Sequence, residues 1–194
     1  MGYSIELIDR KTEKVVHLEN KEFLRSGLVP VIYDETSGHL IPQGSQEASL
    51  SVTYNYSKYY YEATEGDDRF ANPNDGKIEY GIRGLYGKTA WESIPMLKDM
   101  IQRIELKYRP NGEWLQTTRK KKVYLDSSTG KQYDPIKAIG VNIPLKEIEE
   151  SYTVSEGDTS NYWEETAANA ILPLQDMLRL AKQFADEDVV WSGD

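Results

Sequence analysis

The sequence predicts an α+β fold in which an antiparallel sheet of hairpins packs against two main amphipathic helices. Short segments of alternating apolar and polar residues indicate the strands, and two longer segments with apolar residues at steps of three and four indicate the helices. The 194 residues suit a single domain, 1–194. Residues 109–160 separate the two helical segments, and we expect them to form an insertion or projecting arm.

The first helical segment follows a glycine-rich stretch, and together they read GIRGLYGKTAWESIP from Gly81 to Pro95. Thr89 and Glu92 have the spacing of a capping box, in which each side chain accepts a hydrogen bond from the backbone of the other residue. Pro95 removes one ladder bond and predicts a bend or a loose first turn. The apolar face of this helix is predicted to hold Trp91, Ile94, Leu97, Ile101 and Ile104.

The second helix is predicted to begin near Asn161-Tyr162-Trp163-Glu164 and to run to about Ala185, with Pro173 inside it. Its apolar residues again recur at helical spacing, which favours one buried stripe. That stripe is predicted to hold Trp163, Ala167, Ala170, Ile171, Leu174, Met177, Leu178 and Ala181.

The strands are predicted mainly in the N-terminal third of the chain. Tyr3–Ile8 and Lys14–Leu18 flank a polar turn and are expected to form a hairpin. Three further segments have strand character and are bounded by glycine, proline or acidic turns. These segments are Val29–Tyr33, Ala48–Tyr56 and Val189–Trp191.

Within residues 109–160, Asn111-Gly112 is a turn signal. Strands are expected at Glu113–Thr118 and Lys121–Leu125, paired with each other as a hairpin. Arg119–Lys122 is the most basic run of the chain, and an acidic stretch follows it after Pro144. Such a run is usually a solvated strand edge, and the alternative is contact with phosphate or an acidic partner.

The segment Ala48–Tyr56 leads into a run of closely spaced tyrosines: Tyr54, Tyr56, Tyr59, Tyr60 and Tyr61. Neighbouring strand residues point to opposite sides, so these rings cannot all face one core. Tyrosine combines a large rigid ring with a polar tip and is enriched at recognition surfaces. The run is therefore read either as sheet packing or as a binding surface.

Gly87-Lys88-Thr89 at the start of the first helix invites comparison with a phosphate-binding loop. That motif needs a glycine five positions earlier, where this chain has Ile82. We therefore expect a tight turn and a helix cap at this place. A second reading keeps a binding role, because Arg83, Lys88 and free helix N–H groups can hold an anion without hydrolysing it.

Composition argues against several kinds of function. The formal charge is −9, which disfavours direct binding of nucleic acid and suits a basic protein partner. The chain has no cysteine and only His17 and His39, so we expect no metal site, no cofactor and no histidine-based catalysis. Glu164 and Glu165 beside Asn169 are kept as an acid/base pair of a hydrolase, the least favoured reading. No apolar run is long enough to span a bilayer, and we expect a cytoplasmic protein without a membrane partner.

Four segments together resemble a loose group of small proteins of unassigned function carried on bacteriophage genomes and prophages. These segments are SVTYNYS (Ser51–Ser57), GIRGLYGKTAWESIP (Gly81–Pro95), NYWEETAANA (Asn161–Ala170) and VVWSGD (Val189–Asp194). The resemblance covers half of the chain and leaves Arg109–Ser160 unmatched. It implies an accessory protein in the bacterial host cytoplasm that binds and blocks a host defence protein or a nucleic-acid-handling enzyme, and it assigns no catalytic residue.

The sequence therefore predicts a recognition surface where the tyrosine run, the turn from Arg83 to Lys88 and the start of the second helix meet. A host protein is the expected partner. The alternative ligand is a small anionic, nucleotide-like molecule, with its anion at Lys88 and Thr89 and its base stacked on an aromatic ring. The residues predicted to bind are Tyr54, Tyr56, Tyr59, Tyr60, Arg83, Tyr86, Lys88, Thr89, Asn161 and Trp163.

Overall fold

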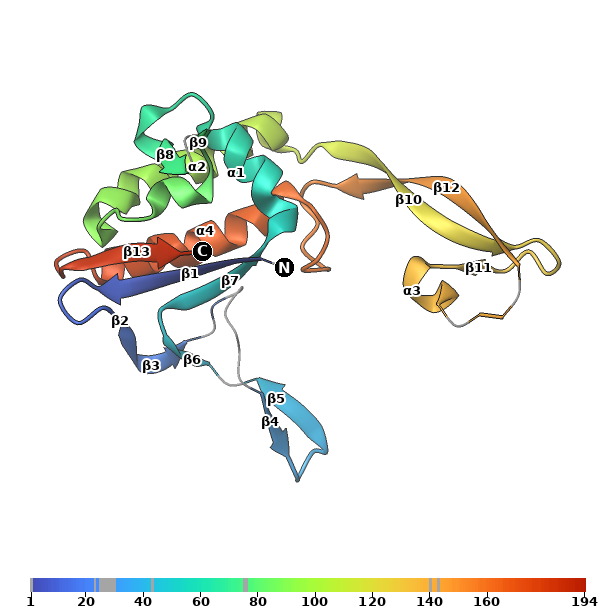
Figure 1. Cartoon of the computed structure of the whole chain (residues 1–194), viewed down its shortest axis with the longest axis horizontal. Helices are drawn as coiled ribbons and strands as arrows, with labels where there is room; N and C mark the ends of the chain where they lie inside the picture. The colour runs from blue at the N-terminus through green and yellow to red at the C-terminus, as the bar shows by residue number, and fades with distance from the viewer. Residues whose placement is uncertain are drawn as a thin grey trace.

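An antiparallel sheet lies against two long helices in the computed structural model, which confirms the α+β fold (Figure 1). The structure describes residues 2–22, 24, 31–42, 44–74, 77–139, 141–142 and 144–194. The helices are α2 (Ala90–Tyr108) and α4 (Ala167–Gln183). The sheet consists of β1 (Gly2–Asp9), β2 (Lys14–Val15), β7 (Ser49–Thr53) and β13 (Val189–Gly193).

Strand β1 is the centre of this sheet. It pairs with β13 along one edge, where Leu7 lies opposite Trp191, and with β2 and β7 along the other. Ile5 and Leu7 are fully buried against the helices, as the alternation of a half-buried strand requires. The predicted first hairpin is confirmed, and the Asp9 carboxylate closes its turn by accepting the N–H groups of Lys11 and Thr12.

Helix α2 begins as predicted. The Thr89 hydroxyl accepts the Glu92 N–H at 3.1 Å, and the Glu92 carboxylate accepts the Thr89 N–H at 2.9 Å. The helix continues through Pro95. Its buried face meets α4 and the sheet, and the indole N–H of Trp191 donates to the Ser93 hydroxyl at 2.8 Å. Trp91, predicted on this face, is 67% exposed instead, because it lies in the polar first turn.

The predicted start of the second helix near Asn161 is wrong. Helix α4 is capped by Thr166, whose hydroxyl accepts the Asn169 N–H at 3.2 Å. Residues 161–165 form turns instead, so Trp163 lies outside the helix and is 65% exposed. The rest of the predicted stripe is largely confirmed, since Ala167, Ala170, Ile171, Leu174, Met177 and Ala181 are buried.

The tyrosine run is helical, which corrects the predicted strand Ala48–Tyr56. Strand β7 ends at Thr53, whose hydroxyl accepts the Asn55 N–H, and the chain then turns through a 3-10 helix, Tyr54–Tyr56, into α1 (Ser57–Thr64). The side chains consequently spread around a helix and do not alternate across a strand.

Residues 116–155, hereafter the arm, extend away from the sheet and helices (Figure 1). Their long strands, β10 (Gln116–Asp126) and β12 (Leu145–Ser155), pair along their whole length. The predicted hairpin of Glu113–Thr118 with Lys121–Leu125 is therefore wrong, because both segments belong mainly to β10. At the tip, β11 (Gln132–Tyr133) pairs with β10, and α3 (Pro135–Ala138) follows it.

The three lysines of the basic run are neutralised within the arm. Lys120 pairs with Glu149 at 2.6 Å, Lys121 with Glu150 at 3.2 Å, and Lys122 with Glu147 at 2.8 Å. Cross-strand pairs of opposite charge stabilise an antiparallel ladder, which explains why the basic and acidic runs find each other.

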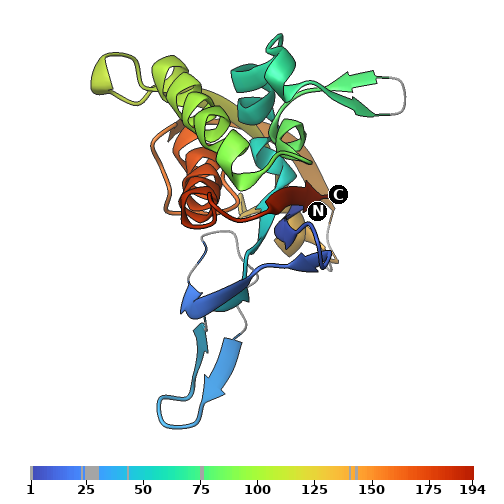
Figure 2. The same ribbon diagram turned by 90° about the vertical axis from the view of Figure 1, so that its left-hand side faces the viewer.

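Smaller hairpins complete the described part of the chain. The β4–β5 hairpin extends away from the sheet on the side opposite the helices. The β8–β9 hairpin projects on the side of the helices (Figures 1 and 2). The predicted strand Val29–Tyr33 is observed from Val31, and its first two residues lie outside the described ranges. None of the helices in those ranges has the length and apolar character needed to cross a membrane. The remaining strands are β3 (His17–Glu22), β4 (Val31–Asp34), β5 (His39–Pro42), β6 (Ser45–Glu47), β8 (Asn72–Asn74) and β9 (Lys77–Glu79).

The α2 capping box gives a test of this fold. We expect Thr89→Ala to lower the free energy of unfolding by about 0.5–2 kcal/mol, because the Glu92 N–H loses its side-chain acceptor. Thr89→Ser keeps the hydroxyl and should retain most of the stability. Urea unfolding followed by circular dichroism measures both variants, and an equal loss in the two would contradict the capping role.

Candidate functional site

Side chains from separate parts of the chain meet around Tyr3 on β1. The Tyr3 and Ser57 hydroxyls are hydrogen-bonded at 2.7 Å, and the ring of Tyr54 meets that of Tyr3 edge-on with 4.6 Å between centroids. The Arg83 guanidinium lies 5.6 Å from the centre of the Tyr3 ring, within range of a cation–π interaction. Strand β1, the start of α1 and the glycine-rich segment thus converge. The sequence predicts the meeting of the tyrosine run with the Arg83 segment but not the part of β1.

The loop before α4 joins the same place. The Asn55 side-chain amide donates to the Trp163 carbonyl at 2.9 Å, and the Tyr56 hydroxyl donates to the Tyr162 carbonyl. The Tyr162 hydroxyl returns a bond to the Ser51 carbonyl at 3.0 Å. We call the resulting surface the tyrosine face. Its members are Tyr3, Tyr54, Tyr61, Tyr80, Arg83, Tyr86, Tyr162 and Trp163.

Three of the predicted binding tyrosines lie beneath this face. Tyr56, Tyr59 and Tyr60 are buried, and each hydroxyl is already used as a hydrogen-bond donor within the protein. Burial raises the pKa of Tyr60 well above its usual range, so its hydroxyl keeps the proton it donates to the Ala170 carbonyl. These rings hold the face in shape. Of the rings in the predicted run, Tyr54 and Tyr61 are the exposed ones.

The sequence analysis missed several members of the face. Tyr3, Tyr61, Tyr80 and Tyr162 join it without having been predicted as binding residues. The rings of Tyr61 and Tyr80 meet edge-on with 6.2 Å between their centroids, and the Tyr61 hydroxyl donates to the Glu65 carboxylate at 2.9 Å. The high tyrosine content, 14 residues, was the available signal, but only spatial proximity distinguishes the surface rings from the supporting ones.

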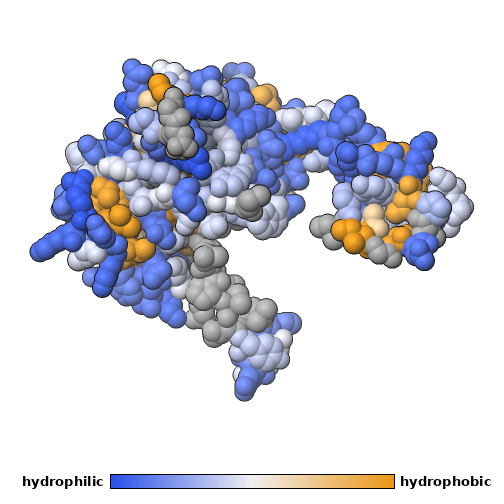
Figure 3. All heavy atoms as spheres, viewed as in Figure 1, coloured by the Kyte–Doolittle hydropathy of each residue, from blue (hydrophilic) through white to orange (hydrophobic). Residues whose placement is uncertain are grey.

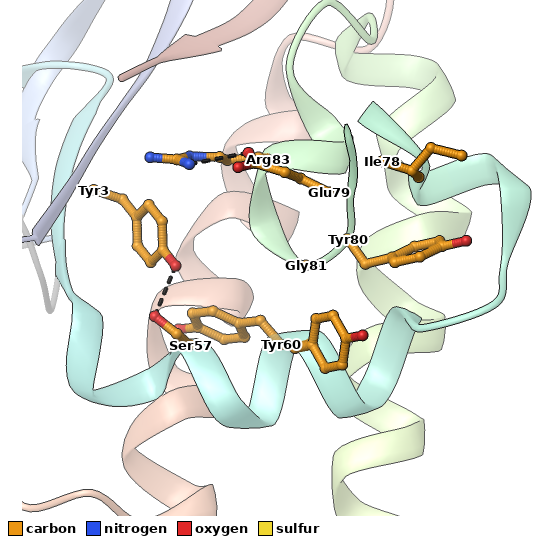
Figure 4. A pocket seen from close by; sticks show the side chains of 9 residues that line it. Tyr3, Ser57, Tyr60, Ile78, Glu79, Tyr80, Gly81 and Arg83 are labelled. Carbon is orange, nitrogen blue, oxygen red and sulfur yellow. Dashed lines mark hydrogen bonds and ion pairs between the residues drawn. The ribbon is translucent and has the colours of Figure 1, made fainter. Parts of the chain in front are cut away.

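A hollow of about 270 Å³ opens in the tyrosine face between α1 and the segment from Ile78 to Arg83 (Figure 4). Tyr3 and Arg83 lie on one side of it, and Ile78 and Tyr80 lie on the other. Its volume is just below the range of about 300–1,000 Å³ typical of small-molecule pockets. The hollow therefore suits a side chain of a partner or a small flat group.

Glycine shapes the wall of this hollow. Gly81 has φ +94°, a left-handed conformation that side chains rarely adopt, and its N–H donates to the buried Thr64 hydroxyl at 2.6 Å. At Gly84 a Cβ atom would lie 2.4 Å from the Phe70 carbonyl oxygen, so only glycine lets the two backbones approach. Gly81 and Gly84 thus allow the backbone on either side of Arg83 to pack closely against its neighbours.

Arg83 is the cationic group of the hollow. Its guanidinium pairs with the Glu79 carboxylate at 3.0 Å, and this hydrogen bond raises the pKa of Arg83 further. About a third of each side chain stays exposed, so the pair presents both charges to solvent. A ligand can therefore meet a donor and an acceptor side by side.

Lys88 and Thr89 occupy a different position from the hollow. The Glu92 carboxylate already accepts the Thr89 N–H, and this bond lowers the pKa of Glu92. A negative charge thus sits at the helix start where the ligand hypothesis expects an external anion. The Lys88 carbonyl meanwhile accepts the Trp191 N–H at 3.0 Å and ties this turn to β13.

A second cluster, which the sequence analysis missed, lies where the arm meets the helices. The Glu156 carboxylate is fully buried and accepts hydrogen bonds from Tyr59 at 2.7 Å, Thr117 at 2.6 Å and the Ala167 N–H at 2.9 Å. The Arg119 guanidinium lies 3.5 Å from the same carboxylate. Burial and the bond to Glu156 raise the pKa of Tyr59.

Glu164 and Glu165, the carboxylates of the hydrolase reading, belong to this cluster. Each lies 3.7 Å from the Arg119 guanidinium, and Glu164 also accepts the Tyr152 hydroxyl. Asn169 is buried beside them and donates to the carbonyls of Asn161 and Glu164. The arrangement fixes the loop that carries Trp163.

Neither a metal centre nor a relative indicates a function. Among the described residues, no group of three or more His, Cys, Asp or Glu side chains is arranged to hold a metal ion. No known protein family, curated protein or solved structure matches the chain. The geometry of the tyrosine face is therefore the feature that indicates a function.

The Glu156 cluster yields a stability test. We expect Glu156→Ala to lower the free energy of unfolding by about 3–5 kcal/mol, because Arg119 loses a buried partner and three donors lose their acceptor. Glu149→Ala removes an exposed ion pair and should cost at most about 1 kcal/mol. Urea denaturation compares the two variants. Equal losses would show that the buried cluster is not the stronger constraint.

Proposed function

We propose that the protein is a binding protein that recognises a protein partner through the tyrosine face. The observation that carries this proposal is the set of exposed aromatic rings on this face, where Tyr54 contacts the Tyr3 ring beside Arg83. Trp163 is 65% exposed, Tyr61 46% and Tyr54 40%. Tryptophan, tyrosine and arginine are the residues that most often dominate the energy of protein–protein interfaces.

The fixed shape of the face supports this role. Asn55, Tyr56 and Tyr162 tie the exposed loop to the start of α1 through hydrogen bonds on both sides. Side chains held in place before binding lose less conformational entropy when a partner docks. Exposed apolar side chains gathered in one patch mark interaction sites, whereas the same side chains scattered singly do not.

The charge of the chain favours a basic partner. The formal charge is −9, and opposite charge accelerates association and excludes acidic surfaces. In the setting that the resemblance to phage-encoded proteins implies, the partner is a host defence or nucleic-acid-handling protein that direct contact blocks. Glu164 and Glu165 have a supporting role in this proposal, because both pair with Arg119.

Variants of the exposed rings test this function. A partner is first captured from host lysate at low salt, identified by mass spectrometry and purified for calorimetric titration. We expect the double variant Tyr54→Ala, Trp163→Ala to weaken its binding by at least about 30-fold, as for interface hot spots. Trp91→Ala is the matched control, since Trp91 is 67% exposed at the start of α2. Unchanged affinity of the double variant, or an equal loss in the control, contradicts the proposal.

The hollow favours one alternative, a small anionic ligand whose flat group stacks beside Tyr3 and whose anion meets Arg83. We expect such a ligand to raise the melting temperature, since binding the native state at 100 times Kd stabilises it by about 2.7 kcal/mol. A thermal-shift screen with mononucleotides and dinucleotides measures this effect. Arg83→Gln should abolish the shift and Arg10→Gln, an exposed arginine on another turn, should retain it. No shift with any nucleotide removes this alternative.

A further inference from the structure

The arm lacks the packing that normally supports a β-ribbon. Strands β10 and β12 form a long ladder that β11 and α3 join only at the tip, and most of its side chains are exposed or only half-buried. A two-stranded hairpin is marginally stable in water unless another layer covers it. At the tip Ile139 is 82% exposed, the largest exposed fraction among the exposed large apolar side chains of the described residues. Apolar atoms gather there on the underside of the arm (Figure 3).

The charge of the arm differs in sign from that of the rest of the chain. Residues 116–155 contain seven Lys or Arg and five Asp or Glu, a formal charge of +2. Because the whole chain carries −9, the remainder carries −11. The strand lysines pair with glutamates of the arm itself, so the excess positive charge is small and suits a protein surface better than the dense charge of nucleic acid. An acidic protein surface is the complementary partner, and the same molecule supplies one.

A hollow of about 350 Å³ is lined by residues of β2, of β3 and of the segment that follows α4. These elements lie at the end of the molecule opposite the arm tip (Figure 1). Val15, Val16 and Phe184 give it an apolar floor. Three carboxylates line it, those of Asp9, Glu19 and Glu187, against the single lysine Lys14. Its shape and charge suit an apolar side chain with a lysine close to it.

The arm tip presents that combination. Ile139 stands two residues after Lys137, whose ammonium group is largely exposed and pairs with Asp134 at the surface. An isoleucine side chain placed in an apolar hollow gains about 1.5–3 kcal/mol from burial. Surface ion pairs such as that of Lys137 are weak enough to exchange partners.

We propose that the arm tip docks into the Asp9–Glu187 hollow of a second copy of this chain. Each copy carries one tip and one hollow at opposite ends of its longest axis, so two copies lying antiparallel satisfy both contacts at once. Such a reciprocal contact is the two-fold arrangement that most homodimers adopt. The tyrosine face takes no part in it, so the inference is independent of the proposed function.

Sedimentation velocity of the full chain over a wide concentration range tests this pairing. We expect a species of twice the 22.2 kDa chain mass whose fraction rises with concentration. Ile139→Glu should raise its dissociation constant at least tenfold, because it places a carboxylate among Asp9, Glu19 and Glu187. Ile78→Glu is the matched control, since Ile78 is 64% exposed on another hairpin and should leave the pairing unchanged. A chain that stays monomeric at all concentrations overturns the proposal.

Two further variants identify the surfaces in contact. Lys137→Glu and Glu187→Lys should each weaken the dimer, and the two together in one chain should restore it. Because the sequence contains no cysteine, Ile139→Cys with Glu187→Cys places the only two thiols on the proposed contact. Mild oxidation should then give a disulfide-linked dimer on a non-reducing gel. Dimers that resist Ile139→Glu, show no charge rescue and form no crosslink overturn the docking of tip into hollow.

Discussion

The buried carboxylate of Glu156 is the constraint on which the arrangement of the molecule depends. It joins the base of the arm through Thr117 and Arg119, α1 through Tyr59, and the first N–H of α4 through Ala167. Removing a charge from water costs several kcal/mol unless hydrogen bonds and an opposite charge replace the lost solvation. The hydrogen bonds and the opposite charge that Glu156 needs are all present only when the arm, α1 and α4 are placed as observed. The cluster therefore favours that placement.

The same tyrosine-rich segment builds both the support and the surface of the tyrosine face. Residues on the inner side of α1 donate their hydroxyls to backbone carbonyls of the loop and of α4, as Tyr60 does to Ala170. Tyr61 on the outer side of α1 and Tyr54 in the preceding 3-10 helix are left to solvent. A buried phenol needs an acceptor for its O–H, and a buried carbonyl needs a donor. The hydrogen bond between them satisfies both groups.

Signals contained within a few residues were read correctly from the sequence. The capping box of Thr89 and Glu92, the first hairpin and the closing strand all depend on local patterns. The start of α4 was misread because Asn161 and Thr166 are both good caps, and the choice between them depends on Glu156 meeting the Ala167 N–H. The pairing of β10 with β12 was missed because turn signals favour nearby partners, and nothing local reports that Lys121 lies opposite Glu150.

The candidate site was predictable only in outline. The tyrosine run lies beside Arg83 through the ring of Tyr3 and beside the Trp163 loop through Asn55. Lys88, predicted at the same place, lies away from the hollow, and Tyr3 gave no local signal. Burial of Tyr56, Tyr59 and Tyr60 follows from the unpredicted helix α1, because helical geometry turns these rings inward.

The length of the arm also has a mechanical consequence. Strand β12 has 11 residues, about 35 Å of extended chain, and it leads directly into Glu156 and the loop that bears Trp163. A small rotation of β12 about Glu156 therefore moves the distant tip over a much longer path.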